Sequence, residues 1–184
     1  WSIQKGSHRL YLLGSIHFLK SDAYPLAAAI ENAYSSSQKV VFETDMNAML
    51  DPAVAQKMMQ LALYPEGQTL DRKLRPDTLN RLKAKMNELG LPMQQFSRFK
   101  AWFIALTLAQ LELQRMGFNP AYGVDMHFFG RAKNDQKQTG FLEPIDFQLN
   151  LLAKMSTTDQ DALLIQTLDE MDIINELASD MLAY

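Results

Sequence analysis

The sequence has no cysteine among its 184 residues. This excludes thiol nucleophiles, CxxC redox motifs, disulfides and every zinc or iron–sulfur centre that is held by thiolates. A metal could therefore be held only by His, Asp or Glu. The absence leaves the compartment open, because cytosolic and exported proteins can both lack cysteine.

Long apolar runs are missing as well. The most apolar stretch, 101–111, is half of the roughly 20 residues that a membrane helix needs, and it contains Gln110. It therefore predicts a buried core helix, and we expect no transmembrane segment. Because 47% of the residues are hydrophobic, a chain of this length can bury a core without disulfides. The prediction is a single domain over 1–184.

Charge of one sign is absent from part of the chain. The stretch 156–184 has seven acids and no base, whereas 71–85 has six bases and two acids. The basic stretch has no interleaved aromatic residues, and the net charge of the chain is −3. We therefore predict a solvated helix face at 71–85 and no nucleic-acid partner.

The first fifty residues alternate between strand and helix patterns. The apolar run 9–13 predicts a strand, and 39–42 predicts a second, β-branched strand. Between them Asp22 and Pro25 open a predicted helix. Strand, helix and strand in this order are typical of a βαβ unit with parallel strands. Parallel sheets carry their functional groups just past the carboxyl ends of the strands.

A helical pattern follows and predicts an insertion over about 46–120, packed on the sheet. Helices are expected after Asp51–Pro52, after Pro76 and over 98–116. The strand pattern returns at 140–142. The predicted fold class is α/β (α+β): a small central, partly parallel sheet with a βαβ start, a large helical insertion and a long C-terminal helix.

The C-terminal helix is expected to start near Asp159 and has no stop signal, neither Gly or Pro nor a basic last turn. The pattern predicts a chain cut within a helix, and the start at Trp1 predicts that a segment was removed in front of it. The apolar face of this helix needs a partner, and a homodimer is one route to it. The face consists of Leu164, Leu168, Met171, Ile174, Ala178 and Met181.

Of the three histidines, His17 is the strongest candidate for chemistry. It follows the first predicted strand by four residues, and Gly14 permits an abrupt turn before it. Glu43 directly follows the second predicted strand, so we expect it at the same rim, at metal-ligand distance from His17. Glu143 repeats the arrangement after 140–142. The structural alternatives are a half-buried loop histidine and a Glu43 that caps the next helix.

Asp125 and His127 lie two positions apart on a predicted helix, so their side chains point about 200° apart. We favour Asp125 as the one that faces the rim and His127 as the one that faces away. The ligand set is then His17 and Glu43 with Asp125 or Glu143. One nitrogen with two or three oxygens suits Mn or Mg better than a catalytic zinc site.

At these residues the sequence resembles the TraB/GumN family, which includes the Tiki-type metalloproteases. The first of the motifs that carry the resemblance is the GxxH motif at Gly14 to His17. The others follow in family order over nearly the whole chain. They are 24–26, 41–45, 100–102, 122–125 and 140–143.

The resemblance implies a metal-dependent, peptidase-like hydrolase that is exported, periplasmic or at the cell surface. It would use Mn, Co or Zn and act on a peptide or protein. It implies His17 and Glu43 as metal ligands, with Glu43 and Glu143 as catalytic carboxylates. The family's second GxxH is missing, so this chain alone is expected to bind metal poorly and to be inactive. Residues expected to line the site are Ser15, Asp45, Arg98, Lys100, Asp125 and His127.

A second hypothesis is a non-catalytic binding or regulatory module. The helical insertion is rich in methionine, which can form an adaptable groove for a peptide or a partner helix. The same side chains can instead fill a core. An exposed apolar groove would favour the module, whereas His17 close to Glu43 would favour the metal enzyme. The methionines are Met46, Met49, Met58, Met59, Met86 and Met93.

Overall fold

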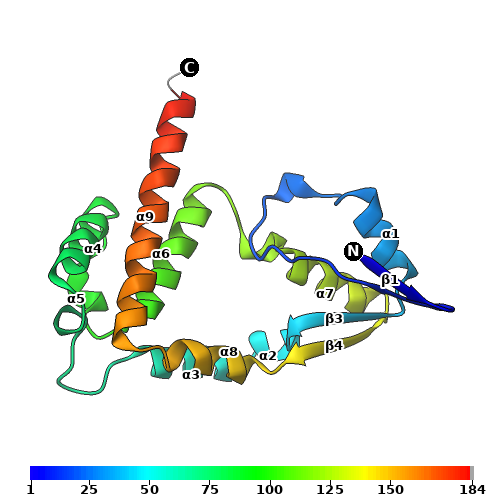
Figure 1. Ribbon diagram of the computed structural model, residues 1–184, viewed down its shortest axis with the longest axis horizontal. Helices are drawn as coiled ribbons and strands as arrows, with labels where there is room; N and C mark the ends of the chain where they lie inside the picture. Colours follow the sequence, from blue (N-terminus) through cyan, green and yellow to red (C-terminus); the bar gives the residue numbers. More distant parts are fainter. Residues whose placement is uncertain (183–184) are drawn as a thin grey trace. The chain divides into compact units, whose positions relative to one another are not determined.

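The computed structural model describes the backbone of residues 1–182 and the side chains of residues 1–173 (Figure 1). Its contacts divide the chain into two compact units. The first unit comprises Trp1–Leu50 and Leu113–Ile145, and the second comprises Asp51–Glu112 and the chain from Asp146 onward. The mixture of helices with small sheets that include a parallel pair confirms the predicted α/β class.

The first unit opens with an antiparallel hairpin of β1 (Ser2–Lys5) and β2 (His8–Tyr11), in which Ile3 lies opposite Leu10. Gly6, with a φ of 60°, reverses the chain between the two strands. The expectation that 9–13 would pair with 39–42 in a βαβ unit was therefore wrong. The hairpin turn gives this strand a local, antiparallel partner instead.

The parallel pair of the first unit consists of β3 (Lys39–Thr44) and β4 (Gln138–Glu143). Both were predicted as strands, and Phe42 lies opposite Phe141 in their register. Helix α7 (Val124–Asn134) covers one face, where the ring of Phe129 meets that of Phe42 edge-on at 5.7 Å. The core of this unit therefore lies between α7 and the parallel pair.

Besides η1 (Ser21–Ala23), the first unit contains three further short helical elements. Helix α1 (Ala28–Ser36) leads into β3, α2 (Met46–Met49) directly follows β3, and η3 (Pro120–Tyr122) precedes α7. The helix expected from Asp22 onward thus begins only at Ala28, because Pro25 and the extended residues around it interrupt the helical backbone.

The second unit is helical. It contains α3 (Pro52–Ala62), η2 (Leu70–Arg72), α4 (Pro76–Glu88), α5 (Met93–Phe96), most of α6 (Ala101–Arg115), nearly all of α8 (Ile145–Ala153), and α9 (Thr157–Leu182). The helices predicted after Pro52 and Pro76 and over 98–116 are confirmed by α3, α4 and α6. None of the described helices is long and apolar enough to cross a membrane.

Helix α9 supplies part of the core of the second unit. Leu164, Leu168 and Met171 are at most 2% exposed and pack with residues of α4 and α6. The side chains of Ile174, Ala178 and Met181, which belong to the predicted dimer face, lie outside the described residues. The described residues of that face are therefore buried in the core of the second unit, and the homodimer stays a prediction.

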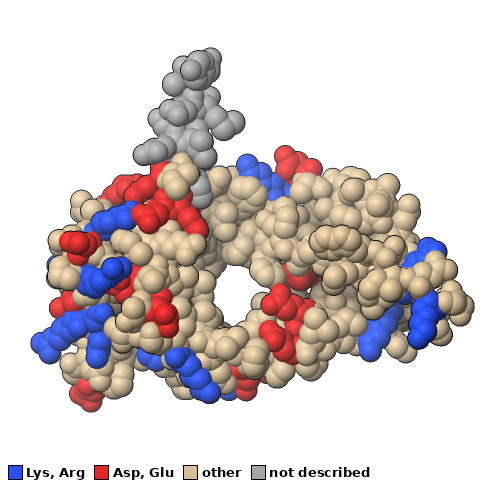
Figure 2. Space-filling view, in the orientation of Figure 1, with Lys and Arg blue, Asp and Glu red and all other residues tan. Residues whose placement is uncertain are grey.

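Charges of α4 and α9 pair across the same contact, and Figure 2 shows basic and acidic side chains intermingled over these helices. Arg81 binds Asp169 at 2.5 Å and Asp172 at 3.0 Å, and Lys85 binds Asp172 at 2.8 Å. The predicted solvated face of 71–85 is therefore only partly correct. Three of its six bases, Arg75, Arg81 and Lys85, pair with acids of the C-terminal stretch.

Candidate functional site

The candidate site lies where the loop after β2 meets the start of α7. The backbone N–H of Val124 donates to the carbonyl oxygen of Ile16 at 2.9 Å. At Gly123, which precedes the helix, an added Cβ would overlap the His17 carbonyl oxygen and lie 2.8 Å from its carbon. Glycine is needed because no side chain fits between the loop and the helix. This contact fixes the His17 backbone on the N-terminus of α7.

Asp125, in the first turn of α7, accepts two side-chain hydrogen bonds from that loop. Its Oδ2 lies 2.7 Å from Nδ1 of His17 and 2.5 Å from Oγ of Ser15. The start of a helix also favours a carboxylate. The Asp125 side chain is 15% exposed and that of His17 is 65% exposed. The mostly buried carboxylate of Asp125 therefore orients the largely exposed imidazole of His17.

The pairing decides which nitrogen of His17 is available. An ionised carboxylate only accepts, so Nδ1 carries the proton that it donates to Asp125. In the neutral ring Nε2 then has a free lone pair, which can accept a proton or bind a metal. The Ser15 hydroxyl also donates to Asp125 and not to His17, so the three residues lack the order of a Ser-His-Asp triad.

His127 does not join this group, as the opposite orientations of Asp125 and His127 on a helix predicted. Its ring stacks on that of Tyr24 at 4.1 Å. Burial and the charge of Arg131 lower the pKa of His127, although Glu31 acts in the other direction. Its Nε2 is buried and has no hydrogen-bond partner among the described residues. His127 is thus a neutral packing residue beside the site.

Tyr24 is a residue of this region whose role the sequence analysis missed. Its hydroxyl donates to the carbonyl oxygen of Tyr122 at 2.7 Å, which ties the segment before α1 to the turn before α7. Burial and the charges of Glu31 and Asp125 raise the pKa of Tyr24. Both segments carry a motif of the resemblance, 24–26 and 122–125, but the motifs do not show that the two segments contact each other.

Glu143 ends β4, whereas Glu43, expected directly after its strand, lies inside β3, one residue before its end at Thr44. Thr44 is the register partner of Glu143, so Glu143 lies on the face that α7 covers. Glu43 precedes Thr44 and lies on the opposite face, where it is exposed. Among the residues whose side chains are described, no three His, Asp or Glu residues form a group that could hold a metal. His17 thus fits a metal as one oriented ligand, but a full ligand set is lacking in this part of the chain.

Asp45 caps a helix, the role considered above for Glu43. Its Oδ1 accepts from the backbone N–H groups of Asn47 at 2.9 Å and Ala48 at 3.2 Å, at the start of α2. The carboxylate is therefore held at the carboxyl end of β3.

A model of the TraB/PrgY/gumN family matches residues 1–184. The chain belongs to this family. It is 25% identical over 179 residues to the uncharacterized protein YbaP of Escherichia coli (strain K12), and equally so to YbaP of Shigella flexneri. Each alignment covers 97% of this chain and 64% of the relative, so the chain spans less than two thirds of the relatives' length. No solved structure matches.

Arg98 and Lys100, both expected to line the site, belong to the second unit. Lys100 Nζ donates to the carbonyl oxygen of Leu61 at 2.7 Å, and Arg98 donates to that of Tyr64 at 3.2 Å. Burial lowers the pKa of Lys100. Both side chains satisfy carbonyl groups at and just after the end of α3. Their structural role is therefore clear, whereas a role in chemistry stays a prediction.

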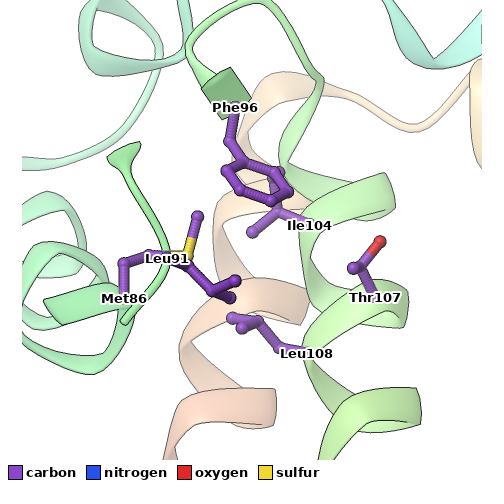
Figure 3. A pocket seen from close by; sticks show the side chains of 6 residues that line it. All are labelled: Met86, Leu91, Phe96, Ile104, Thr107 and Leu108. Atoms are coloured by element: carbon purple, nitrogen blue, oxygen red, sulfur yellow. The ribbon is translucent and has the colours of Figure 1, made fainter. Parts of the chain in front are cut away.

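The methionines of the alternative hypothesis are divided between the two units. Met46 is buried in the first, and Met86 is buried in the second with Leu91, Phe96 and Leu108 (Figure 3). The space between these side chains in Figure 3 has no room for a water molecule. Both methionines therefore fill cores, and at this position there is no open groove for a partner helix.

Proposed function

We propose that this TraB-family chain carries the His17–Asp125 centre of a peptidase-like hydrolase. The observation that supports it is the 2.7 Å contact between Nδ1 of His17 and Asp125, which leaves Nε2 as the reactive nitrogen of an exposed imidazole. The loop contact at Gly123 holds this geometry without help from a ligand.

In the proposed reaction, Nε2 takes a proton from a water molecule as the water oxygen bonds to the carbonyl carbon of a peptide. The His17 ring becomes an imidazolium, which the Asp125 carboxylate stabilises through Nδ1–H. The proton then passes from Nε2 to the leaving nitrogen as the carbon–nitrogen bond breaks. Ser15 holds Asp125 in place by its hydrogen bond and needs no chemistry of its own.

The resemblance implies Mn, Co or Zn, and such an ion would polarise the carbonyl group and acidify a bound water. His17 suits a ligand role as well as a base role, because a carboxylate behind a metal-bound histidine fixes its tautomer. Glu43 and Glu143 stay proposals as the ligand and catalytic carboxylates. The steps above need only His17, Asp125 and water.

The test is hydrolysis of a quenched fluorescent peptide library by the intact protein, with and without Mn, Co or Zn. We expect His17→Ala to lower kcat/KM by about 100-fold or more, the usual contribution of a general base. His8→Ala, at an exposed histidine of β2, is the matched control and should retain activity. Full activity of His17→Ala under every metal condition would refute the proposal.

A further inference from the structure

A cavity of about 150 Å³ lies in the first unit, apart from the contact between His17 and Asp125. Half of its eight lining residues carry large apolar side chains, namely Phe42 of β3, Phe141 of β4, Phe129 of α7 and Met46 of α2. Asp45 and Asn47 add polar atoms at the start of α2. On β3 and α2 the cavity lies at and just after the carboxyl end of the strand, whereas on β4 it is lined by 139–141, before the carboxyl end of that strand.

The size and lining of the cavity select what can enter it. An apolar protein cavity of about 150 Å³ can hold a benzene molecule. The three phenylalanines and Met46 offer no partner for a charge. The carboxylate of Asp45 would repel an acid, and its Oδ1 is already engaged by the backbone N–H groups of Asn47 and Ala48. Because Asn47 and Thr139 are exposed, the cavity can be reached from solvent.

Helix α7 connects the cavity to the proposed reactive centre. Phe129, in the cavity wall, follows Asp125 by four residues, so the two side chains are neighbours on one face of α7, about one turn apart. Helix α7 thus carries both a residue of the cavity wall and the carboxylate that orients His17.

We infer that this cavity is a subsite for one uncharged apolar side chain, of leucine or phenylalanine size, of a peptide ligand. That the peptide is also cleaved rests on the function proposed above, but binding in the subsite does not.

Binding is measured on the 184-residue chain by NMR titration with four amides. They are the N-acetyl amides of phenylalanine, leucine, alanine and glutamate. We expect the first two to bind at millimolar concentration, with shifts at Phe42 and Phe129, and the alanine and glutamate amides to bind at least tenfold more weakly. Equal shifts with all four amides, or none with the phenylalanine and leucine amides, would overturn the inference.

Two tryptophan variants at exposed asparagines test the position. Asn47→Trp places an indole at the cavity and should weaken binding of the phenylalanine amide at least tenfold. Asn134→Trp, at the end of α7, should leave it unchanged. Far-UV circular dichroism confirms that both variants fold, and Thr139→Trp replaces Asn47→Trp if the latter does not. Unchanged affinity in a folded variant with a blocked cavity would also overturn the inference.

His17→Ala separates this inference from the proposed function. We expect it to bind the phenylalanine amide as the parent chain does while the intact variant loses hydrolysis. Retained hydrolysis would refute only the proposed function. Selective loss of the phenylalanine amide shifts in His17→Ala would mean that the amide binds at the histidine, which would overturn only the subsite.

Discussion

Two carboxylates, one in each unit, differ in how fully their hydrogen-bond partners are used. Asp161 of α9 has a side chain that is 5% exposed and accepts three hydrogen bonds, two from Arg75 and one from Thr78. Asp125 of α7 accepts two, but its partner His17 is 65% exposed and keeps one ring nitrogen free. A carboxylate whose hydrogen-bond donors have no other role stabilises the fold. A carboxylate that leaves part of its partner unused can direct a reaction.

The pKa of Asp161 reflects this saturation. Burial by itself would raise it, and this is the largest single influence, but the hydrogen bonds from Arg75 and Thr78 together lower the pKa. Asp161 is therefore ionised in the folded state at neutral pH. Its charge is compensated inside the second unit, between α4 and α9, and this contact accounts for the complementary charges of the two stretches.

The largest effect that we expect is on activity. Asp125→Asn replaces the acceptor of His17 by a group that can also donate, so the ring can turn or adopt the other tautomer. We expect kcat/KM of the intact protein to fall by about 100-fold or more, while the urea midpoint changes little because asparagine keeps the size and one oxygen acceptor of Asp125. Peptide hydrolysis and urea unfolding of the same preparation measure both. A variant that hydrolyses normally would remove Asp125 from the mechanism.

The next effect is on stability. Asp161→Ala leaves the Thr78 hydroxyl and the Arg75 backbone N–H without their acceptor, and we expect a loss of about 2–3 kcal/mol in the free energy of unfolding. Asp169→Ala is the matched control, because its side chain is 55% exposed and its ion pair should contribute less than about 1 kcal/mol. Urea unfolding measures both. Equal losses would mean that burial does not distinguish the two carboxylates.

Gly123→Ala tests the loop contact that presents His17. A Cβ at this position overlaps the His17 carbonyl group, so the loop must move away from α7. We expect a loss of about 1–3 kcal/mol in stability, as for other overpacked sites, together with loss of hydrolysis. Gly130→Ala is the control on the same helix. Nothing lies within 4 Å of a Cβ at this position, so this variant should keep both its stability and its hydrolysis. Thermal unfolding that is the same for both variants would contradict the tight contact.

The smallest effect is a difference in pH dependence between the units. Because the folded-state pKa of His127 is lowered, protonation favours the unfolded state, and this contribution is lost as the pH falls from about 6.5 through the folded-state value. For Asp161 and Asp172, whose pKa values are also lowered, the loss begins only below about pH 4. His127→Phe keeps the stack on Tyr24 and should remove the first loss. Unfolding followed between pH 4 and 7 measures it, and an unchanged slope would be the contrary result.

Local sequence patterns predicted much of the secondary structure. The helices α3 and α4 begin where Pro52 and Pro76 occupy a first helical position, and apolar spacing predicted α6. The strands at 39–42 and 140–142 were also found, and their parallel pairing agrees with the predicted class. These signals depend on residues within about one or two helical turns of each other, so they can be recognised in the sequence itself.

The candidate site was predicted only in part. His17 and Asp125 were both named, but His17 was expected beside Glu43, because the strand before it was expected to pair with β3. Gly6 makes that strand part of a hairpin, and Gly123 allows the loop to dock on α7, where Asp125 is the neighbour. Neither glycine signals by itself which distant segment it will contact.

The sequence by itself determined most of the helices, the strands at 39–42 and 140–142 and the family, because periodicity, caps and ordered motifs are local properties, whereas a reactive role of His17 stays a proposal. Only the tertiary structure decided that His17 meets Asp125, 108 residues away, and that Arg75 meets Asp161, 86 residues away. Such pairs depend on which surfaces pack against each other. That choice depends on close contacts and buried charge, which no short stretch of sequence contains.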